Sequence, residues 1–579
     1  MNSEGLVLAG RSWAGALRGP DLYRWAAIFV LLAVGIGLRS PWPADEPRFA
    51  LAAMDMVLND HWLLPHRGGE IYAEKPPVFM WLQALLFTVT GNMRIAFLLP
   101  SLIASAAMLW MVQDITRRLF GREESWFAVL VLLATVQFTL QAKTAQIDAT
   151  LAGFTTLGLY GLLRHHCVNY SPRWYAVAWL AMGVGIITKG VGFLPVFLLP
   201  GLYFARHRQA NRETSPSSWA VRLSPLLILL PALLWLIPLF LAAYVGERPD
   251  VAAYLNELLF RQTVTRYADG LGHFKPPWYY LVNVIPLLWM PLSVLLIWLI
   301  PDWMRHLRSN SVVHWSLAGF VILALVFFSL SPGKRGVYLL PLLPAMAILA
   351  GGSVSTLVNR RAPIATLRTI TLVLGVILVA AAAATSFELK PLTAYLARSE
   401  MYVLPTMLFL LAIGTLWLLA AILIRNGGAF SFAMLSTWLL LGLWGYALLD
   451  PVRSAGELMS SVESRLGPRS ELAVATFREQ HLLQAKRDVV HWGYRVDGRS
   501  QAVDAANWLK ERGDRYLLIS DELSDACFGS GAGEWLGYRH RKDWRLVTSA
   551  DIDDVTCLAP DTNPVRYLAP YVAYPHGNR

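Results

Sequence analysis

Long apolar runs recur along the first 450 residues of the chain, each of about 18 or more residues with almost no charge. An α-helix needs a run of that length to cross the hydrocarbon core of a bilayer. The clearest examples are Leu226–Tyr244, Val337–Leu357, Thr369–Ser386, Tyr402–Ile424 and Phe430–Leu449. The pattern therefore predicts a polytopic α-helical membrane protein.

Arginine clusters between the apolar runs indicate which loops face the cytoplasm, because loops on that side carry an excess of positive charge. The clusters are Arg117, Arg118 and Arg122; Arg164 and Arg173; Arg206, Arg208, Arg212 and Arg222; Arg305 and Arg308; Arg360, Arg361 and Arg368; and Arg425. With these loops inside, about 13 transmembrane helices are predicted, near residues 22–38, 94–113, 125–141, 147–164, 173–188, 191–205, 226–244, 278–300, 314–330, 337–357, 369–386, 402–424 and 430–449. With the arginine-rich loops inside, the N-terminus is expected in the cytoplasm, and the first span is expected to remain as a signal anchor. Because the number of spans is odd, the C-terminal part is then expected in the periplasm.

One apolar stretch, Val78–Thr90, is shorter than a spanning helix needs, and counting it would place the Arg117 cluster outside. We therefore expect it to lie as a helix at the outer interface. It belongs to the first of two long outer loops, residues 40–93 and 245–277. Both loops mix charged, aromatic and amphipathic stretches and contain a doubled proline before an apolar helix, which is typical of ordered caps.

The composition changes after Asp450, where charged residues become frequent. Glu471–Phe477 and Arg515–Ser520 have the pattern of short strands, and Gln501–Arg512 that of a helix. The sequence thus predicts a transmembrane domain over residues 1–450 and a soluble α+β periplasmic domain over residues 451–579.

The overall composition agrees with this division. The 579 residues are 55% hydrophobic and 15% charged, with a mean hydropathy of +0.45, which excludes a water-soluble enzyme. Of the net charge of +11, residues 1–450 contribute 33 Lys and Arg against 21 Asp and Glu, and residues 451–579 contribute 17 against 18. The positive excess therefore reflects membrane topology and not a nucleic-acid partner.

Three cysteines are too few for a disulfide scaffold. In an oxidising compartment, Cys527 and Cys557 either form one disulfide or stay free, whereas Cys167, at the inner end of a predicted span, should stay reduced.

Carboxylates at the outer ends of two predicted spans are candidates for catalysis. Asp45 and Glu46 follow the first span, and Asp148 begins the fourth. Ionisable groups at a membrane boundary are costly unless they are paired or functional. For Asp45 the alternative is an N-cap of the helical stretch Pro47–Leu58, and the two roles are compatible.

Cationic side chains accumulate on the same outer face. Every lysine of the chain lies on that side of the predicted topology. One explanation is a GC-rich coding sequence that favours arginine over lysine. The other is that these lysines bind an anion on the outer face. The candidates for binding a phosphate are Lys75, Arg48, Lys189, Lys275 and Lys334, together with Tyr338. Cations around two carboxylates suit a phosphate leaving group beside a general base.

The sequence has no Walker loop, dinucleotide fingerprint, His-Glu-x-x-His helix or nucleophile elbow. An enzyme that works on the outer face without such sites needs a substrate that is already activated. A polyprenyl-phosphate sugar is such a substrate.

Several motifs carry a family resemblance. The segments ADEPRFALAAMDMVLNDHWLLPHRGGEIYAEKPP, AQIDATL, GVGIITKGVGFLPVFLLP, GHFKPPWYYL and FSLSPGKRGVYLLPLLPAMAILAG occur in this order. They resemble the lipid A aminoarabinose transferase (ArnT-like) family of GT-C glycosyltransferases, which is related to the protein O-mannosyltransferases. The resemblance covers residues 20–360 well and the remainder loosely.

The resemblance implies a GT-C fold in the bacterial inner membrane and a periplasmic transferase with an undecaprenyl-phosphate sugar donor. It implies that Asp45 and Asp148 are an acidic pair, that Lys75 and Tyr338 contact the donor phosphate, and that Glu74 and His273 are a candidate metal pair. The chain departs from the family at Pro47 and at Lys334-Arg335-Gly336.

The sequence and the resemblance together give an expected reaction. The acceptor, which is lipid A or another cell-envelope glycan or protein, attacks the anomeric carbon with inversion while cations stabilise the phosphate. Asp45 takes the proton of a hydroxyl acceptor, and Asp148 orients a substrate. No cofactor is required, although a divalent cation at Glu74 and His273 is an option. The alternatives are a protein O-mannosyltransferase, an enzyme that modifies O-antigen or oligosaccharides and, in another class, a lipid flippase or secondary transporter.

Overall fold

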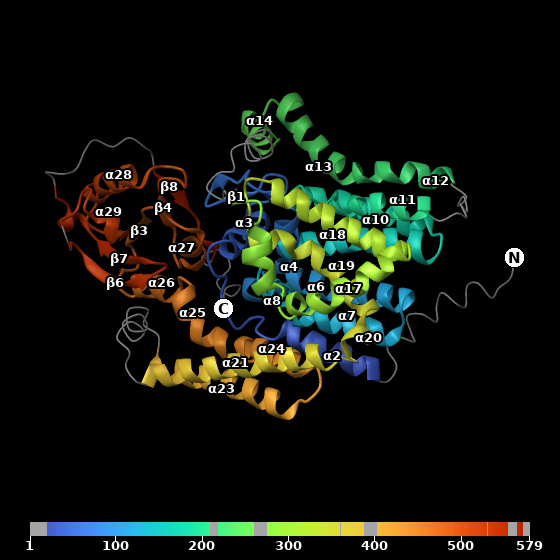
Figure 1. The fold of residues 1–579 in the computed structure, drawn as a ribbon. Coiled ribbons are helices and arrows are strands. Elements are labelled where there is room, and N and C mark those ends of the chain that lie inside the picture. The colour runs from blue at the N-terminus through green and yellow to red at the C-terminus, as the bar shows by residue number, and fades with distance from the viewer. Residues whose placement is uncertain are drawn as a thin grey trace.

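A computed structural model describes residues 20–208, 218–259, 275–358, 360–386, 402–529, 531–553 and 564–570. Figure 1 shows a large helical part, coloured from blue to orange, and beside it a smaller part that contains a β-sheet, in orange and red. Cys557, His273 and Lys390 lie outside the described residues.

The helical part is built from helices of very different length. Its first half contains α2 (Pro20–Ala33), α3 (Glu46–Leu58), α4 (Val78–Thr90), α5 (Met93–Ala96), α6 (Leu99–Leu119), α7 (Arg122–Ala134), α8 (Val136–Ala142), α9 (Ile147–Leu163), α10 (Pro172–Lys189) and α11 (Leu198–Arg208). Its second half contains α12 (Trp219–Leu223), α13 (Leu230–Phe240), α14 (Pro249–Asn256), α16 (Ile285–Leu288), α17 (Leu292–Arg308), α18 (Val312–Leu330), α19 (Leu343–Gly352), α20 (Val354–Val358), α21 (Arg361–Ser386), α23 (Val403–Leu423), α24 (Ala429–Leu440) and α25 (Tyr446–Arg453).

Among the described residues, five helices are long and apolar enough to cross a membrane, or up to eight if each of three sharply bent pairs is one span. The prediction of a helical protein with several apolar segments is confirmed, and the count of thirteen stays a prediction. The helix predicted over residues 78–90 is present as α4.

The span predicted near residues 278–300 is sharply bent. Tyr280–Leu288 and Leu292–Arg308 form two helices that meet at 108°. Pro286 lies within the first of these helices, at the start of α16, and Pro291 directly precedes α17. Because a proline nitrogen cannot donate to the preceding turn, these residues favour a break there.

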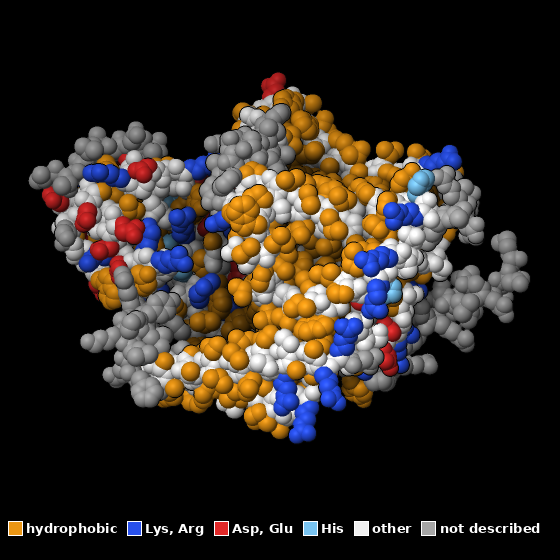
Figure 2. Space-filling model, viewed as in Figure 1, with side chains coloured by type: hydrophobic (Ala, Val, Ile, Leu, Met, Phe, Trp, Pro, Cys, Tyr) orange, Lys and Arg blue, Asp and Glu red, His pale blue; other side chains and the backbone are white. Residues whose placement is uncertain are grey.

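Large apolar side chains cover the surface of the helical part (Figure 2). Examples on three helices are Leu234, Val376 and Leu404, which are 68%, 54% and 60% exposed. An apolar surface this extensive is unfavourable in water and matches the acyl chains of a bilayer.

The C-terminal part contains a six-stranded sheet in the order β6-β7-β5-β3-β4-β8, in which β3 is parallel to β4 and β5 and the outer pairs are antiparallel. The strands are β3 (Glu471–Val474), β4 (Val489–His491), β5 (Arg515–Ser520), β6 (Glu534–Arg539), β7 (Lys542–Val547) and β8 (Val565–Tyr567). The helices of this part are α26 (Gly456–Glu463), α27 (Glu479–Gln484), α28 (Gly498–Lys510) and α29 (Asp521–Ser524). A short hairpin of β1 (His66–Arg67) and β2 (Glu70–Ile71) lies in the first outer loop.

The two faces of the sheet belong to different cores. Alternate residues of a strand point to opposite faces. Ala473 and Leu517 pack with α28, whereas Leu472 and Leu518 share a core with Phe49 of α3. The sheet is therefore packed against the first outer loop, and α25 continues past the predicted boundary at residue 450. The division into two domains stays a prediction.

A buried ion pair connects segments that are far apart in the sequence. The guanidinium of Arg39, 1% exposed, donates to both carboxylate oxygens of Glu46 at 2.5 and 2.7 Å. It also donates to the backbone oxygen of Lys143, and Glu46 accepts from the backbone nitrogens of Trp42 and Ala145. The pair thus joins the connection after α2, the start of α3 and the connection between α8 and α9.

We expect Arg39→Ala to lower the stability of the protein by about 3–5 kcal/mol, because it leaves the buried carboxylate of Glu46 without its cation. The thermal unfolding midpoint of the purified protein in detergent measures the effect. Arg248→Ala, which removes a 56% exposed guanidinium from an ion pair with Asp250, is the control and should leave the midpoint unchanged. Equal midpoints for the two variants would contradict the role of Arg39.

Candidate functional site

Asp45 lies at the start of α3 in a cationic setting. Its carboxylate is 3.7 Å from the guanidinium of Arg48, 3.9 Å from that of Arg335 and 3.5 Å from the amide nitrogen of Gln146. Although Asp45 occupies the N-cap position, its side chain makes no capping hydrogen bond. Its carboxylate is therefore directed to these neighbours and not to the helix, which weakens the N-cap interpretation.

Asp148 lies in the first turn of α9 and is paired with Lys189, the last residue of α10. The ammonium of Lys189 donates to Asp148 Oδ1 at 2.5 Å and lies 4.7 Å from the centre of the Tyr338 ring. Helices α9 and α10 pack against each other in the same core, which brings these two ends together. Three of the predicted site residues therefore form one contact chain.

The segment from Ser331 to Tyr338 connects the two carboxylates. Arg335 reaches Asp45, and Tyr338, three residues later, lies against Lys189. Gln146 makes a second connection, because it contacts Asp45 and lies two residues before Asp148. Contacts of Arg335 and Gln146 thus connect Asp45 with the group formed by Asp148, Lys189 and Tyr338, and the role of these residues as a site stays a prediction.

Lys334 and Lys275 have a different environment from the one that the sequence suggested. The ammonium of Lys334, 4% exposed, donates to the backbone oxygens of Lys275 and Ser331. It thereby holds two loops together, while the side chain of Lys275 is exposed. The neighbouring Arg335, with extended backbone angles of φ −126° and ψ 143°, directs its side chain to Asp45 instead. Successive side chains of an extended segment point to opposite sides, and the sequence does not indicate which of the two cations points to the site.

Two residues of the motif around Asp45 are engaged elsewhere. Glu46 is 5% exposed and is saturated by Arg39 and two backbone nitrogens. Arg48 donates to Glu479 of α27 at 2.7 Å. Burial alone would lower the pKa of the Arg48 guanidinium, but the carboxylate of Glu479 reverses this and raises the pKa above its ordinary value.

The Glu-Lys-Pro-Pro motif lies between the hairpin and α4. Lys75 is partly buried there, and the carboxylate of Glu74 is 3.6 Å from Arg67. Because His273 lies outside the described residues, the predicted metal pair of Glu74 and His273 has no described geometry.

The cysteines give a partial answer to the disulfide question. Cys527 is disulfide-bonded, whereas Cys167 is free. Cys557, the predicted partner of Cys527, is not among the described residues.

Residues 74–235 match a protein family described as dolichyl-phosphate-mannose-protein mannosyltransferase. The chain is also similar to the undecaprenyl phosphate-alpha-4-amino-4-deoxy-L-arabinose arabinosyl transferase 1 of Pseudomonas fluorescens, with 31% identity over 58% of this chain and 61% of that protein. A transferase of the same description from Pseudomonas aeruginosa is 27% identical over 87% of this chain and 94% of its own length. The chain thus spans about three fifths of the first relative and nearly all of the second.

The fold is similar to that of a protein of known structure. The crystal structure of ArnT from Cupriavidus metallidurans in the apo state matches 94% of this chain and 99% of its own, with a TM-score of 0.68 and 19% identity. The same enzyme bound to undecaprenyl phosphate matches with a TM-score of 0.66 and 20% identity. The resemblance to the ArnT-like GT-C proteins is confirmed, and this similarity to solved structures establishes the fold alone.

We expect Lys189→Met to destabilise the protein by about 1–3 kcal/mol, because it leaves the largely buried carboxylate of Asp148 without a partner. The double variant Lys189→Met/Asp148→Asn removes the charge as well and should recover part of the loss. Thermal unfolding of the wild type, both single variants and the double variant in detergent gives the coupling between the two sites. Strictly additive effects would show that the pair is not coupled.

Proposed function

We propose that this ArnT-like chain is a membrane glycosyltransferase that moves a sugar from an undecaprenyl-phosphate carrier to a cell-envelope acceptor on the periplasmic side. The observation that carries the proposal is the cluster in which Asp45, between Arg48 and Arg335, is connected to Asp148, Lys189 and Tyr338. It combines carboxylates for a proton or a sugar hydroxyl with cations for a phosphate. The names of the sequence relatives support the same donor.

In the proposed reaction, an acceptor oxygen forms a bond to the anomeric carbon, and the bond from that carbon to the phosphate oxygen breaks with inversion. The electron pair of the broken bond stays on the phosphate, where Arg335, Lys75 and Lys189 stabilise the added charge. For a hydroxyl acceptor, the released proton goes to Asp45. A phosphate acceptor has no proton to lose at neutral pH, and Asp45 then binds and orients the substrate.

The remaining candidates have supporting or peripheral roles in this proposal. Glu46 positions Asp45 and does not react, because its oxygens are fully engaged. Lys334 shapes the loop that presents Arg335 and Tyr338. Lys275 and Arg48 border the site and contribute positive charge. No cofactor is required, and a divalent cation at Glu74 and His273 would act on the loops and not on the reacting bond.

We also propose the topology predicted above, with about thirteen crossings, a cytoplasmic N-terminus and the sheet region in the periplasm. Lys and Arg side chains gather along the side of the helical part that lies away from the sheet (Figure 2), which supports this orientation.

Two classes of acceptor are candidates for the transfer. The resemblance to the lipid A aminoarabinose transferase family favours lipid A, whereas the match of residues 74–235 to a protein mannosyltransferase family favours a protein. Mass spectrometry of lipid A, surface polysaccharide and periplasmic glycoproteins from deletion and wild-type cells distinguishes them. A glycan that is lost on deletion and restored by the wild-type gene identifies the acceptor, and no difference in any of the three fractions would contradict the proposed function.

We expect Asp45→Asn to reduce turnover of a hydroxyl acceptor by about 10²–10⁴-fold, because the general base is lost. The rate of undecaprenyl phosphate release by purified protein measures this. Asp60→Asn is a matched control in the same loop, because Asp60 is exposed and its φ of 57° suits asparagine. Near-wild-type turnover of Asp45→Asn with a hydroxyl acceptor would exclude the role of base.

We expect Lys75→Ala to weaken binding of undecaprenyl phosphate by about tenfold or more, because a charge-assisted contact to the phosphate is lost. The Kd of the purified protein for undecaprenyl phosphate measures the change. Lys510→Ala, at an exposed position of α28, should leave the Kd unaltered. The same Kd in all three proteins would exclude Lys75 from the phosphate site.

A further inference from the structure

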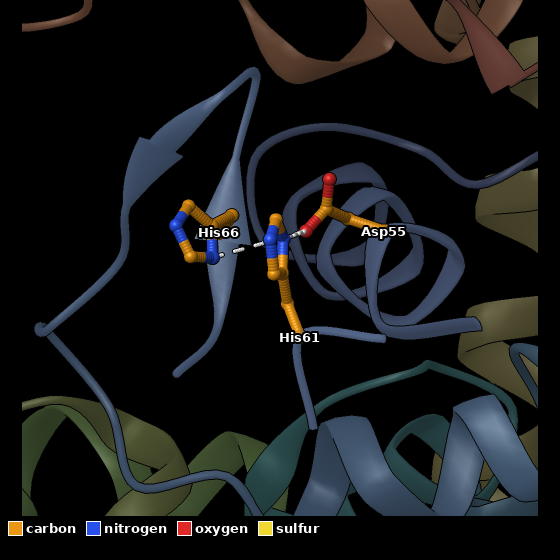
Figure 3. A group of neighbouring side chains, drawn as sticks. All are labelled: Asp55, His61 and His66. Atoms are coloured by element: carbon orange, nitrogen blue, oxygen red, sulfur yellow. Dashed lines mark hydrogen bonds and ion pairs between the residues drawn. The ribbon is translucent and has the colours of Figure 1, made fainter. Parts of the chain in front are cut away.

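Two histidines and a carboxylate meet in the first outer loop, apart from the site described above (Figure 3). Asp55 lies near the end of α3, His61 in the connection that follows and His66 at the start of β1. Asp55 Oδ2 is 2.8 Å from His61 Nδ1 and 3.9 Å from His66 Nδ1, and the two imidazole rings are stacked with their centres 3.9 Å apart.

The donor atoms of this cluster suit a transition metal ion. One ligand atom from each of the three residues lies within 4.8 Å of the other two. In a tetrahedral zinc site with bonds of about 2.0–2.1 Å, neighbouring ligand atoms are about 3.3 Å apart. The distance of 2.8 Å between Asp55 Oδ2 and His61 Nδ1 is that of a hydrogen bond and is shorter than this separation, so the His61 side chain, which is 39% exposed, must rotate for both groups to bind one ion.

Two hydrogen bonds to neighbouring groups involve Asp55 and His66. Asn59 donates from its amide nitrogen to the other oxygen of Asp55 at 2.8 Å, and His66 Nδ1 lies 2.7 Å from the backbone oxygen of Leu64. The bond from Asn59 is of the kind that holds a ligating carboxylate in orientation. Binding of a metal to His66 Nδ1 replaces the hydrogen bond to Leu64, and the ring proton then lies on Nε2.

The cluster is separate from both other candidate sites. Asp45 and Asp55 are ten residues apart on or next to α3, which corresponds to about 15 Å along the helix. Glu74 is not one of its three residues. The cluster instead lies between the end of α3 and the start of the hairpin β1–β2. Glu74 and Lys75 follow this hairpin directly in the sequence.

We propose that Asp55, His61 and His66 bind one Zn²⁺ ion, with water as the fourth ligand, and that the ion fixes the hairpin to the end of α3. Two imidazoles and one carboxylate match the ligands of known zinc sites better than those of Ca²⁺ or Mg²⁺, which prefer oxygen. The proposal does not depend on the proposed glycosyl transfer, because the ion acts on the loop.

The test uses the full-length protein in detergent after its affinity tag has been removed and bound metal has been extracted with a chelator. Titration with Zn²⁺ alone gives the stoichiometry and the Kd for the wild type, His61→Ala, His66→Ala and the control His207→Ala. His207 is exposed at the end of α11, far from the cluster in sequence. X-ray absorption at the zinc edge of the loaded wild type gives the ligand types.

We expect one Zn²⁺ per chain in the wild type and in His207→Ala, and at least tenfold weaker binding in each of the other two variants. We also expect Zn²⁺ to raise the unfolding midpoint of the wild type but not of His61→Ala, whose half-exposed side chain can be removed without opening the core. Equal zinc binding in all four proteins, no binding at micromolar Zn²⁺, or a first shell without imidazole would overturn the proposal.

Discussion

The ion pair between Arg39 and Glu46 is the interaction on which the geometry of the candidate site depends. Burying two charges is costly unless each finds its partner and its remaining hydrogen bonds. Here Arg39 also lies over the rings of Trp42 and Tyr446, at 4.5 and 5.0 Å from their centres, so the cation is enclosed by aromatic faces as well. Since Asp45 precedes Glu46 directly, the position of the candidate base is fixed by its neighbour.

A second constraint comes from the C-terminal sheet. One face of the sheet packs on α28, and the other shares a core with α3 of the first outer loop. The buried carboxylate of Glu479 adds a polar connection, because both Arg48 and Arg67 approach it, at 2.7 and 3.5 Å. The C-terminal residues therefore contribute to the shape of the loop that carries Asp45, even though none of their described side chains is part of the proposed reaction.

The candidate site is built from the ends of helices and the loops that join them. Asp148 is held by the start of α9, Lys189 by the end of α10, and Arg335 and Tyr338 by the connection after α18. Rigid helices packed in one core place these ends, while the loops supply side chains that reach the substrate. Charge at the ends of helices and not at their centres agrees with an enzyme of the membrane interface and differs from the pattern typical of a transporter.

The sequence by itself determined the helical membrane character, the positions of several helices, the strands Glu471–Val474 and Arg515–Ser520, and some of the residues that are proposed to form the site. These features follow from local patterns, because apolar length, periodicity and the sign of charge act over a few residues. Only the tertiary structure decided that Arg335 and not Lys334 faces Asp45, and that both oxygens of Glu46 accept hydrogen bonds from Arg39. It also decided that the helix near residues 278–300 bends, and that Asp55, His61 and His66 lie together. Those outcomes depend on which side chains point to one another across distant segments, and that information arises only when the packed core fixes the backbone.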